Sequence, residues 1–231
     1  MNFKKITHVI YDLDGLLLDT EPLHLLMIQT IVSRYGKVFD PSIQSKFAGR
    51  NALDSARILV EMLALPITAQ AFLEEREVFL DQLLPQAKPL PGAIRLTKHL
   101  HQHQIPQAVA TSSARRPFRL KTTHYQEWFA LFDCIVLGDD PTLKRGKPAP
   151  DIFLLAAQRL GASPEECLVF EDAHAGMEAA LAAGMSVIVV PHSGVDKQLY
   201  REASQILDSL TDFDPQLWHL PSFCGDAHTG S

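Results

Sequence analysis

The sequence has few of the features that mark secreted, membrane or metal-thiolate proteins. It contains only three cysteines in 231 residues, and Cys134, Cys167 and Cys224 show no CxxC spacing, which argues against a disulfide framework or a cysteine metal site. No apolar stretch approaches the roughly 20 residues that cross a membrane. The opening residues, MNFKKITHVIYD, turn acidic too soon for a signal peptide. These absences predict reduced thiols and a cytoplasmic protein without a membrane segment.

Positive charge is scarce as well. The chain carries 21 Lys and Arg residues against 27 Asp and Glu residues, a formal net charge of −6, and its basic runs are as short as Arg115-Arg116. Nucleic-acid polymers are bound by large basic surfaces, so none is expected as a partner. An acidic protein can still bind a small anionic substrate if a metal ion and a few placed cations offset the charge. We expect a monomeric chain.

Short apolar runs rich in β-formers recur along the chain, separated by helical segments. The runs are continuous rather than alternating, which is typical of strands buried on both faces of a parallel sheet. They are Ile6–Tyr11, Gln107–Ala110, Cys134–Leu137, Cys167–Phe170 and Val187–Val190. One intervening helix is predicted to begin at Pro150-Asp151 and end at Gly161, and a capping-box pattern at Ser163–Glu166 predicts another. The alternation predicts an α/β fold with a doubly wound parallel sheet.

One part of the chain breaks this alternation. Between the first strand and the rest of the sheet the pattern is helix after helix, at Leu23–Tyr35, Ala52–Leu63 and Ala69–Leu84. We therefore predict a catalytic core of residues 1–18 and 86–231, and an inserted all-helical cap of residues 19–85 over the strand ends. The last residues, 224–231, are predicted to form a flexible tail.

Polar side chains follow several of the predicted strands, at the edge where open parallel sheets bind ligands. Carboxylates gathered at one sheet edge repel one another unless a cation lies among them, and oxygen ligands of this type suit Mg²⁺. The residues concerned are Asp12 and Asp14 after the first run, Thr111, Ser112 and Ser113 after the second, Glu171 and Asp172 after the fourth, and Lys147 in a nearby loop.

This arrangement resembles the haloacid dehalogenase (HAD) superfamily of phosphotransferases. The superfamily's motifs occur here in its order, as Asp12-Leu13-Asp14-Gly15, Thr111, Lys147 and Glu171-Asp172. The helical insertion after the first motif resembles the cap of the β-phosphoglucomutase-like branch. The resemblance implies a Rossmann-like core and an enzyme, namely a magnesium-dependent phosphomonoester hydrolase whose partner is a small phosphorylated metabolite.

The resemblance also implies roles for the paired carboxylates. Asp12 would attack phosphorus and take the phosphoryl group as an aspartyl-phosphate. Asp14 would protonate the leaving oxygen and later accept a proton from water, which requires a pKa raised toward neutrality. The haloacid dehalogenases themselves lack a carboxylate at the position of Asp14, so its presence indicates phosphate ester chemistry.

The remaining motif residues would hold the ion and the phosphoryl group. The residues implied as metal ligands are Asp12, Asp14 through its carbonyl, Asp172 and Glu171. The residues implied at the phosphoryl oxygens are Thr111, Ser112 and Lys147. Substrate specificity would come from the cap and its borders, where the candidates are Thr20, His24, Arg50, Asn51 and Arg115.

Over nearly its full length the chain also resembles the pseudouridine-5′-phosphatase group, in segments such as DGLLLDTE, ATSS, IVLGDDP and GKPAPDIFL. This resemblance implies nucleotide metabolism, with pseudouridine 5′-phosphate or a similar nucleoside monophosphate as substrate. A sugar or polyol phosphate is the alternative. A sugar phosphomutase fits less well, because Ala52 stands where the mutase pattern has arginine.

A group of histidines and a group of aromatic residues are predicted to have structural rather than functional roles. His99, His101 and His103 could suggest a metal site, but a solvated helix face is the better interpretation because no carboxylate or cysteine has matching spacing. Trp128, Phe129 and Phe132 are predicted to be core residues.

Overall fold

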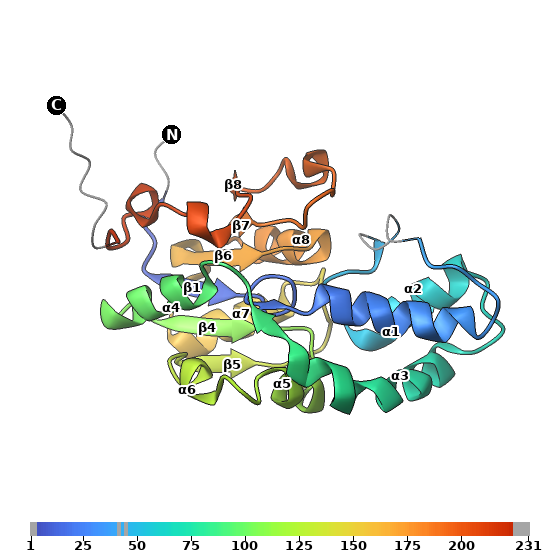
Figure 1. Ribbon diagram of the computed structural model, residues 1–231. Coiled ribbons are helices and arrows are strands. Elements are labelled where there is room, and N and C mark those ends of the chain that lie inside the picture. The colour runs from blue at the N-terminus through green and yellow to red at the C-terminus, as the bar shows by residue number, and fades with distance from the viewer. Residues whose placement is uncertain (1–3, 41–42, 44–45, 224–231) are drawn as a thin grey trace.

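A computed structural model describes residues 4–40, 43 and 46–223 and shows a six-stranded parallel sheet in the order β5-β4-β1-β6-β7-β8 (Figure 1). The strands are β1 (His8–Tyr11), β4 (Gln107–Ala110), β5 (Cys134–Val136), β6 (Cys167–Glu171), β7 (Ser186–Val189) and β8 (Gln205–Ile206). All five predicted strands are present, and the short edge strand β8 was not predicted. Because β1 lies centrally, the residues that follow it have neighbours on both sides.

Helices cover both faces of the sheet, and successive residues of β1 show how the two layers divide. Val9 and Tyr11 join a cluster with Trp218 and with α4 (Ala93–Gln102) and α6 (Gln126–Phe129). The side chain of Ile10 points to the opposite face, against α7 (Asp151–Leu160) and α8 (His174–Ala182). This alternation on a fully buried strand confirms the doubly wound α/β fold.

The helical insertion has a core of its own. It consists of α1 (Glu21–Ser33), α2 (Ala52–Met62) and α3 (Ala69–Leu83), which lie to one side of the sheet (Figure 1). Val32, Leu59 and Phe72 are buried together between these helices. The chain enters through β2 (Leu18–Asp19) and returns through β3 (Lys88–Pro89), and these strands pair with each other in antiparallel fashion. The domain boundaries stay a prediction.

The three aromatic residues predicted in the core, Trp128, Phe129 and Phe132, are buried, which confirms that prediction. The capping-box prediction is wrong, because residues Pro164–Glu166 form only a 3₁₀ turn and the Ser163 side chain makes no cap hydrogen bond.

The solvated-face interpretation is also wrong for His99, which is buried: its Nε2 lies 2.8 Å from the carbonyl oxygen of Pro221, and its ring packs on Phe223. No helix in the described part of the chain could span a membrane. Cys224 and the predicted tail lie outside the described residues.

Candidate active site

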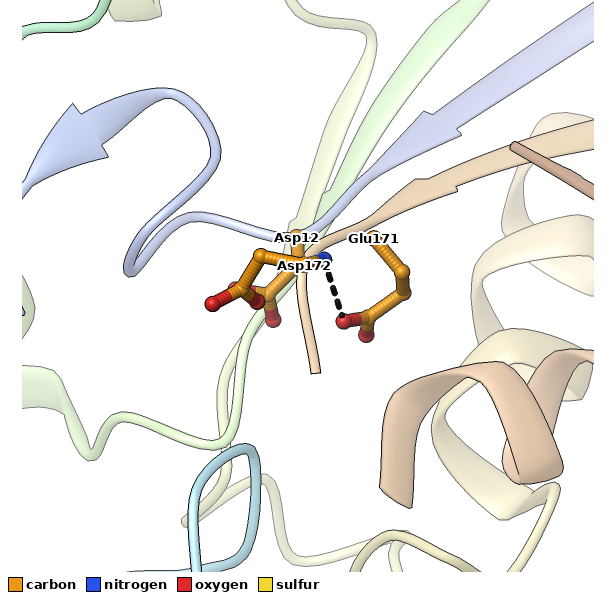
Figure 2. A group of neighbouring side chains, drawn as sticks. All are labelled: Asp12, Glu171 and Asp172. Atoms are coloured by element: carbon orange, nitrogen blue, oxygen red, sulfur yellow. Dashed lines mark hydrogen bonds between the residues drawn. The ribbon is translucent and has the colours of Figure 1, made fainter. Parts of the chain in front are cut away.

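Three carboxylates converge where β1 and β6 end. Asp12 directly follows β1, Glu171 is the last residue of β6, and Asp172 comes next. They are 4%, 0% and 8% exposed, and one ligand oxygen from each lies within 4.8 Å of the others. Figure 2 shows the three side chains together, with the Asp172 amide donating to Oε2 of Glu171 at 3.2 Å. The convergence follows from adjacent parallel strands that end at the same edge.

Lys147 neutralises part of this charge. Its Nζ donates to Oδ1 of Asp12 and to Oε1 of Glu171, both at 2.6 Å, and to the carbonyl oxygen of Ala110 at 3.1 Å. The side chain has no exposed surface. Burial by itself would lower the pKa of Lys147, but Asp12 and Glu171 together raise it above its ordinary value, so Lys147 is charged at neutral pH.

One ammonium group does not balance three buried carboxylates. Burial, opposed by Lys147 and reinforced by Glu171 and Asp14, raises the pKa of Asp12 to about 7. Burial and the neighbouring Glu171 and Asp12 raise the pKa of Asp172 well above its ordinary value. A divalent cation would remove this repulsion, and a donor set made only of carboxylate oxygens fits a hard ion such as Mg²⁺.

Two glycines make room for these carboxylates. Gly15, which has a φ of +82°, follows Asp14, and a Cβ at this position would overlap the carboxylate of Asp172. A Cβ at Gly176 in α8 would overlap the carboxylate of Glu171. Side-chain volume at either position is therefore incompatible with the carboxylate positions in the structure.

Asp14 is held in a separate network. Its Oδ1 accepts a hydrogen bond from Thr20 at 2.8 Å, and its Oδ2 accepts one from Ser113 at 2.8 Å and a longer one from Thr111 at 3.4 Å. Nζ of Lys121 lies 2.6 Å from both oxygens. The Asp14 side chain nevertheless keeps 25% of its surface exposed.

This network corrects the expectation of a raised pKa for Asp14. Burial by itself would raise it, but Lys121 and then His24 outweigh burial and hold the pKa of Asp14 well below its ordinary value. In this arrangement Asp14 is a carboxylate. The sequence pattern could not show this, because Lys121 lies more than a hundred residues further along the chain.

The structure brings some of the candidate specificity residues to Asp14 and leaves others apart. Thr20 contacts Asp14 directly, and Nε2 of His24 lies 3.7 Å from its Oδ1. Arg50 is half-buried in the loop before α2. Asn51 caps α2, where its side chain accepts from the amide of Asp54 at 2.9 Å. The Arg115 side chain is exposed at the start of α5 (Arg115–Lys121).

Ser112 connects the core to the insertion. Its hydroxyl donates to the carbonyl oxygen of Gly49 at 2.8 Å, so in this arrangement the side chain contacts the cap loop. A Cβ at Gly49 would lie only 2.7 Å from Cβ of Ala173, which shows how closely that loop approaches the core. The phosphate-binding role of Ser112 stays a prediction.

Sequence reasoning gave no role to Ser113 and missed Lys121 and Arg76. Ser113 and Lys121 contact Asp14, and Nε of Arg76 on α3 is buried without a hydrogen-bond partner among the described residues. The charge of Arg76 interacts with Asp14. Ser113 follows the second strand, so the sequence pattern could place it at the sheet edge. Lys121 and Arg76 lie on helices, where spacing from a strand end gives no signal.

Comparison with known proteins identifies the family. A family model described as haloacid dehalogenase-like hydrolase matches residues 6–184. The (DL)-glycerol-3-phosphatase 1, mitochondrial, of Arabidopsis thaliana is 47% identical over 96% of this chain and 76% of its own length. The protein named probable pseudouridine-5′-phosphatase in Drosophila melanogaster is 40% identical; the match covers 95% of this chain and 96% of that protein.

A solved structure shares the fold. That of β-phosphoglucomutase from Clostridium difficile has a TM-score of 0.79 at 22% identity, covering 93% of this chain and 97% of that one. At that identity the likeness concerns the fold alone. The expected fold, the resemblance to the superfamily and the expectation of a phosphatase are confirmed by these findings. The match over most of the chain shows that it belongs to the haloacid dehalogenase-like hydrolase family.

Proposed function

We propose that this phosphatase hydrolyses small phosphate monoesters through an aspartyl-phosphate on Asp12, with Mg²⁺ as cofactor. The observation that carries the proposal is the position of Asp12: it is almost fully buried, in contact with Lys147 at 2.6 Å, and grouped with Glu171 and Asp172. A carboxylate used only for stability has no need of two further buried carboxylates and an incompletely balanced charge.

In the first step an oxygen of Asp12 attacks phosphorus, and the bond from phosphorus to the ester oxygen breaks. Lys147 offsets the charge that the incoming phosphoryl group brings toward Asp12. Residues Asp12, Asp172 and Glu171, with the carbonyl of Asp14, would hold Mg²⁺, which when bound neutralises phosphoryl charge. Thr111 and the backbone N–H of Ser112 are proposed to donate to the phosphoryl oxygens.

Asp14 moves the proton in both steps. The leaving alcohol oxygen takes a proton from the carboxyl group of Asp14 as the ester bond breaks. Water then attacks the aspartyl-phosphate, gives its proton back to the Asp14 carboxylate, and releases inorganic phosphate and free Asp12. In the free enzyme, Lys121 favours the ionised form of Asp14. When a dianionic substrate approaches, its negative charge raises the pKa of the Asp14 carboxyl group. The bound substrate therefore favours the acid form of Asp14 that the first step requires.

The leaving group is proposed to be an alcohol that carries further hydroxyl groups. The relatives are named for glycerol 3-phosphate and for pseudouridine 5′-phosphate, and both esters have such a leaving group. His24 and Arg76 offer polar atoms beside Asp14. Pseudouridine 5′-phosphate and glycerol 3-phosphate are therefore the first pair of substrates to compare. We further propose a monomeric enzyme that acts in the cytoplasm.

The test is phosphate release from p-nitrophenyl phosphate and from a panel of nucleoside, sugar and polyol monophosphates. We expect turnover with Mg²⁺, none after treatment with EDTA, and a loss on the order of 10³-fold or more for Asp12→Asn. The matched control is Asp208→Asn, whose side chain is 80% exposed, and it should behave like the wild type. Undiminished turnover of Asp12→Asn would refute the mechanism, and isomerised sugar phosphate without free phosphate would indicate a mutase.

A further inference from the structure

Lys121 is a buried cation that the four motifs do not include. It is the last residue of α5, and its side chain has no exposed surface. Its Nζ lies 2.6 Å from each oxygen of Asp14 and 2.5 Å from the hydroxyl of Ser113. The ammonium group therefore donates both to the carboxylate of Asp14 and to a hydroxyl that itself binds that carboxylate at 2.8 Å.

Packing alone does not account for a lysine at this position. A buried ammonium group is costly unless a counterion and hydrogen bonds compensate it, and a hydrophobic side chain of similar length fills space at less cost. Asp14 is the acidic residue that Lys121 contacts, and Asp14 is partly exposed. The lysine thus lies behind the carboxylate, on its buried side, and leaves the other side of the carboxylate accessible.

The site has two ammonium groups with different partners. Lys147 binds Asp12 and Glu171, whereas Lys121 binds Asp14. The nucleophile and the proton-transfer group are therefore held by separate cations from separate elements. This separation lets the orientation of Asp14 be changed without a change in the contacts of Asp12.

We propose that Lys121 is a positioning residue for proton transfer: together with Ser113 it fixes the carboxylate of Asp14 toward the ester oxygen. Lys121 does not touch the substrate and acts only through Asp14. The proposal rests on the proposed function, because it takes Asp14 to be the proton-transfer group. It predicts that loss of Lys121, like loss of Asp14, slows turnover of esters whose leaving group needs a proton, and that the loss is smaller.

The test is a double-mutant cycle between Lys121→Met and Asp14→Asn. Two substrates are compared: glycerol 3-phosphate, whose leaving alkoxide needs a proton, and p-nitrophenyl phosphate, whose leaving group needs little help. We expect Lys121→Met to lower kcat by about 10²-fold on the first and by no more than about tenfold on the second, with KM nearly unchanged. In the Asp14→Asn background the same substitution should change kcat by less than about twofold.

Control variants distinguish a positioning role of Lys121 from a folding defect and from a failure of the proposed function. Lys98→Met removes an exposed lysine and should change neither substrate. Ser113→Ala keeps Lys121 and should show the same dependence of kcat on the leaving group. Circular dichroism shows whether Lys121→Met is folded. If it is not, the double-mutant cycle is measured between Ser113→Ala and Asp14→Asn. Equal losses on both substrates, or a full effect of Lys121→Met in the Asp14→Asn background, would overturn the positioning role. Turnover by Asp12→Asn would instead refute the proposed function.

Discussion

Gly176 and Glu171 are packed so closely that a Cβ added to the glycine would overlap the carboxylate of the glutamate. Alanine in place of a helical glycine ordinarily stabilises a protein by up to about 1 kcal/mol. Here we expect the opposite sign: Gly176→Ala should lower the melting temperature and reduce turnover at least tenfold, because Glu171 must leave its contact with Lys147 at 2.6 Å. Thermal unfolding and phosphate release measure the two effects.

The control for this substitution is Gly36→Ala. Gly36 has a positive φ, +68°, which Gly176 does not, and no atom of the described residues lies within 4 Å of the Cβ that would be added. It should lose about 1 kcal/mol of stability to backbone strain and keep full activity. An active Gly176→Ala variant with a raised melting temperature would contradict the tight packing around Glu171.

Metal binding should stabilise the folded protein. Asp12, Glu171 and Asp172 repel one another in the buried cluster, and a divalent ion that binds the folded state adds RT ln(1 + [Mg²⁺]/Kd) to the free energy of unfolding. We expect the melting temperature to rise with Mg²⁺ concentration in the wild type and to rise much less in Asp172→Asn. Asp212→Asn, at an exposed position, should respond like the wild type. An equal response from Asp172→Asn would place the ion elsewhere.

Arg76 should affect substrate recognition more than stability. Its buried Nε has no hydrogen-bond partner among the described residues, so replacement of the side chain breaks no hydrogen bond at this atom. With a polyol or nucleoside phosphate, Arg76→Met should reduce kcat/KM about tenfold, the effect of one lost hydrogen bond to a charged group. With p-nitrophenyl phosphate the effect should be small. Arg119→Met, exposed on α5, is the matched control, and a similar loss on all esters would argue against leaving-group contact.

Cys167 should be the least reactive thiol of the described residues. Burial and then the carboxylates of Glu166 and Glu165 raise the pKa of Cys167 to about 12, so at pH 8 almost none of it is the reactive thiolate. In a Cys224→Ser background, iodoacetamide at pH 8 should leave Cys167 unmodified in the folded protein and modify it in urea. Peptide mass spectrometry distinguishes the sites. Rapid labelling of folded Cys167 would contradict its burial.

The main features of the fold could be predicted because β1, β4 and β6 are buried on both faces and so are marked by continuous apolar runs. The carboxylates at their ends could be predicted for the same reason, since parallel strands end at one edge. Lys121 could not, because it reaches the site from a helix and its burial depends on tertiary packing. The lowered pKa of Asp14 could not be predicted either, because it depends on the ammonium group of Lys121.

His99 shows the corresponding limit for helix faces. Its position on α4 indicated solvent, but the segment around Pro221 and Phe223 returns to cover it. Chain segments distant in sequence thus decide which polar positions are buried. Periodicity along a single helix contains no information about them.

The paired strands β2 and β3 place the beginning and the end of the helical insertion side by side, with Leu18 opposite Pro89 and Asp19 opposite Lys88. A chain that leaves and re-enters the core at one point can be shortened there: a tight turn in place of the residues between Asp19 and Lys88 would close the core without stretching it. The same geometry makes the insertion exchangeable, because any segment with adjacent ends fits the junction. Under the proposed function, replacement of this one module would change substrate preference while the sheet that carries Asp12 stays as it is.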